Sequence, residues 1–487
     1  MKKLLMIILG VLVVFIFVLM FNTLTFTAKQ EGAGTVDHVD VDSKAALSRL
    51  SQALQIPTIS HQDSTKFDTS KIIEFHQFLE KNYPLVHQRL KREVINDYSL
   101  LYKWTGSDTS LKPVAILAHI DVVPIEPGTE SKWKYDPFSG AVAEDYVWGR
   151  GALDMKSTLT AIMEAAEENL KQGFAPRRTL YFAFGHDEEL GGPNGAKYIA
   201  AHLKSKGVQL DFTVDEGMPI LNEQLSPIKR PTAIIAIAEK GYITLKITAK
   251  HKGGHSSMPP LKTTLGMLAR AITALEDNQM PASYDGPAKL LFDYIGPEMP
   301  FVKKLLFANS WLFEGVIISQ LEKIPFMNAS LRTTTAPTII NGGVKENVLP
   351  SQAHALVNFR IRPGNTPDDV IAHAKKVIDN PAVEVAVHGR KGTFPSPVAS
   401  VDAMGFKLIQ KTIGETFKDT FVAPGLMIAG SDTKHYVAIS DNNYRHYPIV
   451  FGPNDTKLIH GTNERIAATS YIKMIQYNAR LLKNVSM

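Results

Sequence analysis

The stretch that decides the fold is VAILAHID, residues 114–121, in which five apolar residues lead directly into His119 and Asp121. Two further short runs, TLYFAF at 179–184 and DFTV at 211–214, are also followed by acidic residues. Apolar runs of this length, bounded by polar residues, are typical of buried strands. The sequence therefore predicts three buried strands with charged groups at their carboxyl ends.

Helical patterns lie between these strands. The segment 157–172 places Leu159, Ile162, Met163 and Ala166 on one helix face. Strands that alternate with amphipathic helices predict an α/β fold with a doubly wound, mostly parallel sheet. In such sheets the ligand site lies at the carboxyl ends of the strands. The residues that follow each strand are therefore the candidates for a functional site.

Acids and histidine gather at these strand ends. A further acid, Asp154, lies in GRGALDMK (149–156), where a glycine-rich turn leads into the helix at 157. Carboxylates that converge in one cleft repel each other and raise each other's pKa unless cations compensate. A cluster of histidine and carboxylates suits zinc or a similar divalent metal. The set comprises His119, Asp121, Asp154, His186, Asp187, Glu188, Glu189, Asp215 and Glu216.

The composition narrows the chemistry further. The 487 residues include no cysteine, which excludes disulfides, thiolate metal sites and a cysteine nucleophile. The net charge is only +5, with both signs interspersed along the chain, so nucleic acid is not an expected partner. Sequence patterns of other catalytic sites, such as HExxH, GxSxG and the P-loop, are absent from the sequence. Metal-assisted hydrolysis is the chemistry that these observations favour.

The N-terminus carries a separate signal. Leu4–Phe21 is uncharged and apolar on all sides, and a bilayer-spanning helix needs about 17–25 such residues. A cleaved signal peptide is the alternative, but residues 23–28 contain no clear small-x-small cleavage site. We expect a single-pass membrane anchor at 1–21 and a polar tether at 22–43. Lys2 and Lys3 would stay cytoplasmic, which places the catalytic domain outside the cytoplasm, in the periplasm or the extracellular space.

The pattern changes after residue 238. Strands are predicted near 242–248, 333–340, 353–361 and 383–387, with helices at 263–277 and 367–378. This order, strand-helix-strand-strand-helix-strand, predicts a ferredoxin-like unit. We therefore expect a catalytic domain formed by 44–238 and 392–487. A lid at 239–391, with an insertion at 281–330, would interrupt it.

Several motifs together resemble one family. AHIDVVP (118–124), GRGALDMK (149–156), GHDEE (185–189) and GGHSS (253–257) are similar to motifs of the di-zinc aminoacylase/carboxypeptidase family. The likeness extends through RTTTA (332–336), ENVLP (346–350), NFR (358–360) and IHG (459–461), in that order. It is closest to the branch that contains carboxypeptidase S and the N-fatty-acyl-amino-acid synthase/hydrolases.

The resemblance implies two Zn²⁺ ions per subunit. His119 would bind one and His460 the other, Asp154 would bridge them, and Glu189 would complete the shell of the second. The remaining ligand would be Asp215 or Glu216; adjacent side chains in a strand point to opposite sides, so only one can face the metal, and we expect Asp215. Glu188 would be the general base, and Asp121 would fix the ring of His119.

The resemblance also implies roles in the lid. His255 would stabilise the oxyanion, by reaching into a neighbouring subunit of a homodimer formed through the lid. Asn347 and Arg360 would bind the free carboxylate of the substrate, and Gly430 would line its site. The expected substrate is a small molecule, either a dipeptide or an N-acyl amino acid.

The sequence leaves three alternatives open. The enzyme could be a strict dipeptidase. The chain could also be a non-catalytic zinc-binding receptor or scaffold, although such a protein would not need Glu188 beside a full ligand set. The aromatic insertion 281–330 either packs as a helical core or forms a channel for an acyl chain.

Overall fold

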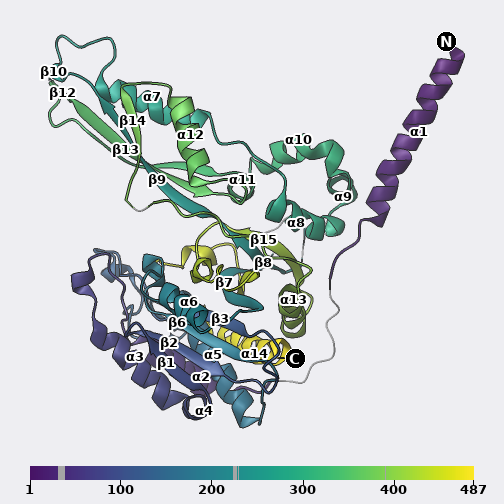
Figure 1. Cartoon of the computed structure of the whole chain (residues 1–487), viewed down its shortest axis with the longest axis vertical. Helices are drawn as coiled ribbons and strands as arrows, with labels where there is room; N and C mark the ends of the chain where they lie inside the picture. Colours follow the sequence, from purple (N-terminus) through teal and green to yellow (C-terminus); the bar gives the residue numbers. More distant parts are fainter. Residues whose placement is uncertain (31–38, 223–227, 229, 390, 487) are drawn as a thin grey trace.

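The computed structural model of the chain describes residues 1–30, 39–222, 228, 230–389 and 391–486. Figure 1 shows a large α/β domain, a smaller domain built on a second sheet, a group of short helices between them and a long N-terminal helix that projects away. The two sheets are separate, and the chain passes from the first to the second and back.

The large domain is built on an eight-stranded mixed sheet with the order β1-β2-β6-β3-β7-β16-β8-β15. The central strand β3 runs parallel to β6 and β7, whereas the edge pair β1–β2 is antiparallel. A mostly parallel sheet was expected; β2 departs from it, because it runs antiparallel to both β1 and β6, and so do β8 and β15, because β8 runs antiparallel to β7 and β16 and β15 is parallel to β8. The strands are β1 (Lys91–Ile95), β2 (Ser99–Trp104), β3 (Val114–His119), β6 (Leu180–Gly185), β7 (Phe212–Leu221), β8 (Thr232–Glu239), β15 (Phe421–Met427) and β16 (Asn443–Phe451).

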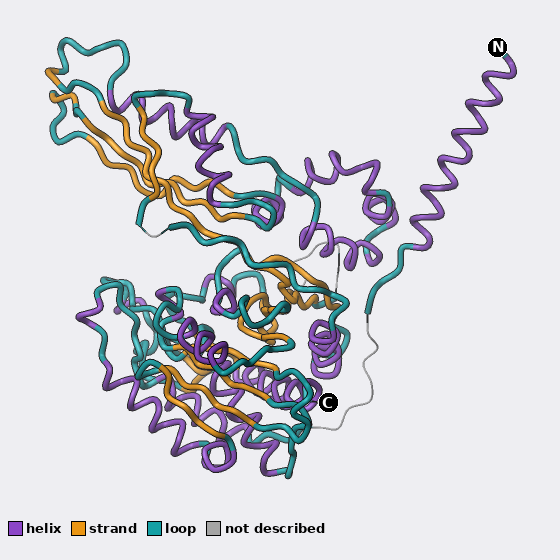
Figure 2. The backbone as a smooth tube through the Cα atoms, in the orientation of Figure 1, coloured by secondary structure: helices purple, strands orange, loops and turns teal. Residues whose placement is uncertain are grey.

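Helices cover both faces of this sheet (Figure 2). Successive β3 side chains alternate between two hydrophobic cores, Ile116 in one and Leu117 in the other. Helices α5 (Lys156–Lys171) and α14 (Ala468–Val485) contribute to the first core, and α6 (Ala196–Ser205) contributes to the second. The domain also contains α2 (Ser43–Leu54), α3 (Thr69–Asn82), α4 (Pro84–Arg89), α13 (Met404–Thr416) and a small sheet of β4 (Val142–Ala143), β5 (Tyr146–Trp148) and β17 (Arg465–Ala467).

The smaller domain has the element order β-α-β-β-α-β. Its antiparallel sheet runs β11-β13-β9-β14, and one face packs against two helices through its own hydrophobic core. The predicted helix at 367–378 and strand at 383–387 are found at those bounds. The elements are β9 (Gly241–Lys250), α7 (Thr264–Asp277), β11 (Thr334–Gly342), β13 (Gln352–Ile361), α12 (Pro367–Ile378) and β14 (Val383–Val387), with β10 (Gly254–His255) and β12 (Val348–Leu349) paired at its tip.

A helical insert separates α7 from β11. It consists of α8 (Gly286–Ile295), α9 (Phe301–Ala308), α10 (Ser310–Leu321) and α11 (Pro325–Leu331). Leu291 and Phe292 are buried, and the ring of Phe292 stacks on that of Phe307 with centroids 4.5 Å apart. Much of the apolar content of the insert therefore packs as a helical core, continuous with that of the large domain.

The N-terminal helix α1 (Lys2–Thr25) continues past the predicted end of the anchor at residue 21. The hydroxyl groups of Thr23 and Thr25 donate hydrogen bonds to carbonyls one turn earlier. By length and composition α1 is able to cross a membrane, and an N-terminal signal sequence would pass the same test.

The segment after α1 is attached to the large domain, although a free tether was expected over 22–43. Gln30 exchanges two hydrogen bonds with the backbone of Val422 in β15, at 2.8 and 2.9 Å. Val39 is buried in the main core, and its carbonyl accepts a hydrogen bond from Gln476. The side-chain amide of Gln30 therefore holds this segment to β15. This contact is long-range in sequence, so polar composition alone does not predict it. Residues 31–38 of the predicted tether lie outside the described residues.

Candidate metal centre and active site

Two histidines face each other across one carboxylate. The Nε2 atom of His119 lies 3.0 Å from Oδ1 of Asp154, and the Nε2 atom of His460 lies 3.0 Å from Oδ2 of the same residue. Glu189 Oε2 is 3.3 Å from His460 Nε2. The ligand atoms of His119, Asp154 and Glu189 lie within 4.8 Å of one another, as do those of His119, Glu188 and Glu216. The structure thus brings residues that are distant in sequence into one cluster.

Local structure explains how each group reaches the cluster. His119 is the last residue of β3, and Glu189 lies in a short 3₁₀ helix, Glu188–Leu190, directly after β6. Asp154 sits in the turn that leads into α5. Because β3 and β6 are parallel neighbours, their carboxyl ends open on the same edge of the sheet.

His460 is held by a buried ion pair that the sequence analysis missed. Its backbone φ of +57° is uncommon for a residue other than glycine, and such strain often occurs at functional sites. Arg150 donates a hydrogen bond to the carbonyl of His460 and forms a 2.6 Å ion pair with Glu464. Glu464 also accepts hydrogen bonds from the backbone N–H groups of Leu153 and Asp154. Arg150 lies inside the recognised GRG turn, but Glu464 lies three residues beyond the IHG motif, so the sequence did not indicate the pair.

The structure places Glu216 rather than Asp215 beside His119. Glu216 Oε1 lies 3.6 Å from His119 Nε2. Asp215 instead accepts a hydrogen bond from the backbone N–H of Glu216. This placement differs from the expected choice of Asp215, because successive side chains of β7 point to opposite faces and only that of Glu216 points to the cluster.

Asp121 connects His119 to the turn that carries Glu188 and Glu189. The Nδ1 atom of His119 lies 2.9 Å from the Asp121 carbonyl and 3.3 Å from its carboxylate. The same carboxylate accepts hydrogen bonds from the backbone N–H groups of Glu188 and Glu189 and from the Ser60 hydroxyl. Asp121 therefore orients the ring of His119 and the turn that carries both glutamates.

The carboxylates are crowded enough to perturb each other. Burial, with the charges of Asp432 and Glu216, raises the pKa of Glu188 well above its usual value. Burial and the charge of Asp154 raise the pKa of Glu216 to about 8. Hydrogen bonds with Asp154 and Glu189 raise the pKa of His460 to about 10. The cluster therefore favours bound positive charge. Asp432, which the sequence analysis did not single out, is buried next to this group.

The expected oxyanion-stabilising residue, His255, and the three expected substrate-binding residues, Asn347, Arg360 and Gly430, lie in three places. His255 and Asn347 are neighbours where β10 pairs with β12. Figure 1 shows these two strands at the end of the smaller domain that lies away from β3 and β6 of the large domain. Arg360 lies in β13, with its guanidinium over the Tyr242 ring at 4.9 Å. Gly430 follows β15, two residues before Asp432. The structure does not bring His255 to the cluster within one chain.

A cleft opens beside Glu189. Its volume of about 360 Å³ is at the lower end of the range for small-molecule sites. It is lined by Ser60, His61, Gln62, Asp63, Lys66, Val123, Pro124, Glu189 and Leu190. Most of the lining comes from the loop 60–66, which carries no motif and which the sequence analysis therefore missed.

The donor set fits divalent metal ions. It offers imidazole nitrogens and carboxylate oxygens, the donors that zinc prefers when thiolates are absent. The buried atom Glu189 Oε1 has no hydrogen-bond partner among the described residues. Oxygen atoms buried without a partner are costly unless a further group binds them.

An α/β sheet with a histidine–carboxylate cluster at the carboxyl ends of its strands defines a class, the metal-dependent hydrolases. The chain belongs to Peptidase family M20/M25/M40, which matches residues 115–484, and is an enzyme of this metal-dependent hydrolase family. It is 40% identical over 485 residues to a probable carboxypeptidase S-like 2 of Dictyostelium discoideum, covering 98% of this chain and 93% of the relative.

Two further comparisons agree. An N-fatty-acyl-amino acid synthase/hydrolase of Xenopus tropicalis is 38% identical over 447 residues, covering 91% of this chain and 86% of the relative. The crystal structure of an M20 family metallo-carboxypeptidase from Sulfolobus solfataricus superposes with a TM-score of 0.66 at 21% identity, covering 91% of this chain and 99% of the other. That likeness shows the fold.

Proposed function

We propose that the chain is a di-zinc hydrolase that cleaves an amide bond next to a free α-carboxylate. The observation that carries this proposal is the single carboxylate of Asp154 with one histidine at each oxygen, His119 and His460, both at 3.0 Å. Glu216 would serve the His119 ion and Glu189 the His460 ion. When bound, zinc supplies Lewis acidity, which polarises a carbonyl group and makes water a stronger acid.

The residues of the chain then divide the remaining work. Glu188 takes a proton from the attacking water and returns it to the leaving nitrogen, a role that suits a buried carboxyl with a raised pKa. Asp121 keeps the ring of His119 in one tautomer and orientation. Arg360 would bind the α-carboxylate of the substrate through its guanidinium. Asn347 lies beside His255 at the tip of the smaller domain, so it would join this carboxylate only from a second copy of the chain.

The substitution Glu188→Gln tests this mechanism. It removes the titrating group but keeps the size of the side chain, so we expect hydrolysis to be lost while bound zinc stays near two equivalents. Glu276→Gln, at an exposed position on α7, is the matched control and should keep full activity. Activity retained in Glu188→Gln would refute the mechanism. A zinc-loaded wild-type chain that cleaves none of a panel of dipeptides and acyl amino acids would favour a receptor or scaffold.

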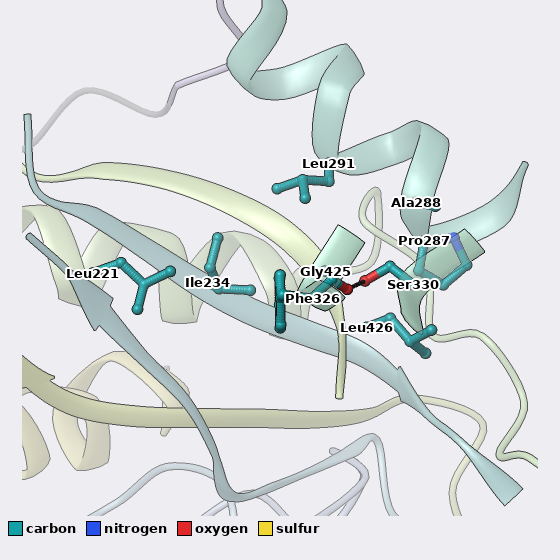
Figure 3. Close-up of a pocket in the computed structure, with 9 residues that line it drawn as sticks. All are labelled: Leu221, Ile234, Pro287, Ala288, Leu291, Phe326, Ser330, Gly425 and Leu426. Carbon is teal, nitrogen blue, oxygen red and sulfur yellow. Dashed lines mark hydrogen bonds between the residues drawn. The ribbon is translucent and has the colours of Figure 1, made fainter. Parts of the chain in front are cut away.

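The substrate class within this proposal is N-acyl amino acids and dipeptides. Relatives at 38% and 30% identity are named an N-fatty-acyl-amino acid synthase/hydrolase and carboxypeptidase S. An apolar cavity lies between the insert and β7, β8 and β15 (Figure 3), but its volume of about 10 Å³ holds at most one water-sized group. An acyl chain would therefore require the insert to move. Turnover of acetyl- and long-chain acyl-amino acids should be compared, and a clear preference for acetyl groups would exclude an acyl channel.

The site also supports a homodimer through the smaller domain. His255 stands at the tip of that domain, so a role at the metal centre requires the tip of a second copy. The outer strand β11 exposes Ile339 and Ile340, which suits strand or face contact between copies. Light scattering should give the mass of two chains, and mixing His255→Ala with Glu188→Gln should restore activity to part of the population.

Helix α1 would anchor the enzyme with its catalytic domain outside the cytoplasm. Its apolar surface is exposed throughout the 18-residue window that could span a membrane. Extraction at alkaline pH should leave the full chain in the membrane, and protease added to the non-cytoplasmic side should degrade the catalytic domain. N-terminal sequencing that begins after residue 25 would show a cleaved signal peptide instead.

A further inference from the structure

Helix α1 is fixed to the helical insert by a buried polar contact. The side chain of Asn309, between α9 and α10, is fully buried. Its amide group donates to the Leu19 carbonyl at 3.2 Å and to the Thr23 hydroxyl at 3.3 Å, and its oxygen accepts from Asn22 at 2.9 Å. Because one side chain serves three groups of α1, the insert and the helix have a defined relative position.

An aromatic contact extends this attachment along α1. The rings of Phe15 and Trp311 meet edge to face, with centroids 6.4 Å apart. Phe15 lies six residues before Phe21, the end of the apolar run, so at 1.5 Å per residue it is about 9 Å inside that run. A hydrocarbon core is about 30 Å thick. If α1 spans the bilayer, Trp311 lies at the level of the lipid acyl chains.

The insert exposes an apolar face next to this contact. We define the docking face as six residues of the insert with exposed side chains. They are Phe301 (52% exposed), Val302 (71%), Trp311 (61%), Leu312 (42%), Val316 (48%) and Ile324 (51%). Single exposed apolar residues are ordinary, but a group of them on neighbouring short helices marks an interaction surface.

The charged residues around the docking face suit the edge of a bilayer. Lys303 follows Val302, and Lys323 precedes Ile324; both are exposed. Lysine beside apolar residues can place its ammonium among the phosphate groups while its stem stays in the apolar layer. Glu314 is exposed on α10, so a position of this helix deep in the hydrocarbon core would place a carboxylate there.

We propose that the docking face of the insert rests in the bilayer leaflet on the side of the catalytic domain. The inference depends on the proposed anchoring by α1 and goes beyond it. Since Gln30 also fixes the chain after α1 to β15, the catalytic domain is held against the membrane at a defined orientation rather than carried on a loose tether. A hydrolase held this way reaches substrates with apolar groups that are dissolved in the bilayer.

Depth-dependent quenching tests the proposal on the full chain. The chain has no cysteine, so single substitutions can each carry one environment-sensitive fluorophore. We choose Val302→Cys and Val316→Cys on the docking face, Val13→Cys in α1, and Val344→Cys, which is 94% exposed in the loop that leads to β12, as the matched control. Each variant is reconstituted in phosphatidylcholine/phosphatidylglycerol vesicles, with or without lipids that carry a nitroxide on the acyl chain.

The expected result is quenching at 302, 316 and 13 and none at 344. Quenching at 13 without quenching at 302 and 316 would overturn docking and leave the anchor standing. No quenching at 13 would overturn both anchoring and docking.

Intrinsic tryptophan fluorescence tests the same proposal without labels. Trp104, Trp133 and Trp148 are buried, so brominated lipids should quench the emission of Trp311 alone. Trp311→Phe should therefore lose the part of the emission that these lipids quench. Equal quenching in the wild-type chain and in Trp311→Phe would contradict the proposal.

Discussion

Loss of Glu464 should damage both the stability of the chain and its metal centre. The side chains of Glu464 and Arg150 are 0% and 3% exposed, and they form a 2.6 Å ion pair. In Glu464→Ala the guanidinium of Arg150 stays buried without its partner, which costs about 3–5 kcal/mol. The backbone N–H groups of Leu153 and Asp154 also lose their acceptor. This is a large part of the 5–15 kcal/mol by which a typical domain is stable.

The same substitution should weaken zinc binding about 10- to 100-fold, the range for residues that orient metal ligands. Arg150 holds the carbonyl of His460, and Glu464 holds the backbone of Asp154, so both sides of the bridge lose support. Glu464→Gln should be milder, because burial raises the pKa of Glu464 to about 7 and a neutral acceptor is therefore already accessible.

Urea unfolding followed by circular dichroism and competition with a zinc-chelating dye measure the two effects. Glu384→Ala is the control, since its ion pair with Lys250 is exposed and its loss should change neither quantity measurably. The reasoning is refuted if Glu464→Ala unfolds and binds zinc as Glu384→Ala does.

Three further outcomes follow from the site and the core. Glu216→Gln should lose one zinc equivalent by elemental analysis, whereas Asp215→Asn should keep two; the reverse pattern would restore Asp215 as the ligand. Removal of metal with a chelator should lower the melting temperature because the carboxylates then repel each other, and added zinc should restore it. Burial lowers the pKa of His446 to about 4, below its unfolded value near 6.5, so stability is full above pH 6.5 and falls by up to about 3 kcal/mol as pH drops to 4. Urea titrations at several pH values should show this fall reduced in His446→Gln, and an identical fall in both chains would contradict the assignment.

The sequence predicts the cluster well where strand ends fix it. His119 and Glu189 follow apolar runs that become parallel neighbours, and parallel strands open their carboxyl ends on one edge. The order of strands and helices in the smaller domain is predictable for a similar reason, since alternation along β13 and the capped helix α12 are local features. Local periodicity and the ends of strands are therefore readable from the residues themselves.

Side-chain direction at one position is not readable in this way. Asp215 and Glu216 are both acids at the end of an apolar run, and which one faces His119 depends on how β7 pairs with β3 and β16. The pairing with β16 shifts register immediately after Asp215, so the local pattern of the chain does not determine the direction of either side chain. The pair Arg150–Glu464 is similarly hidden, because its partners are 314 residues apart.

The local sequence of α10 likewise does not determine which of its residues are buried. The sequence WLFEGVIISQL is apolar around most of the helix, a pattern that fits a buried core helix and a membrane-associated helix equally. Burial distinguishes them: Ile317 and Leu321 point into the insert, whereas Trp311 and Val316 stay exposed. Trp311 is thus exposed and yet packed against α1, the helix that is able to cross a membrane. Because this contact joins residues about 300 positions apart, only the tertiary structure shows that the apolar residues of α10 divide between a buried core and an exposed face that contacts α1.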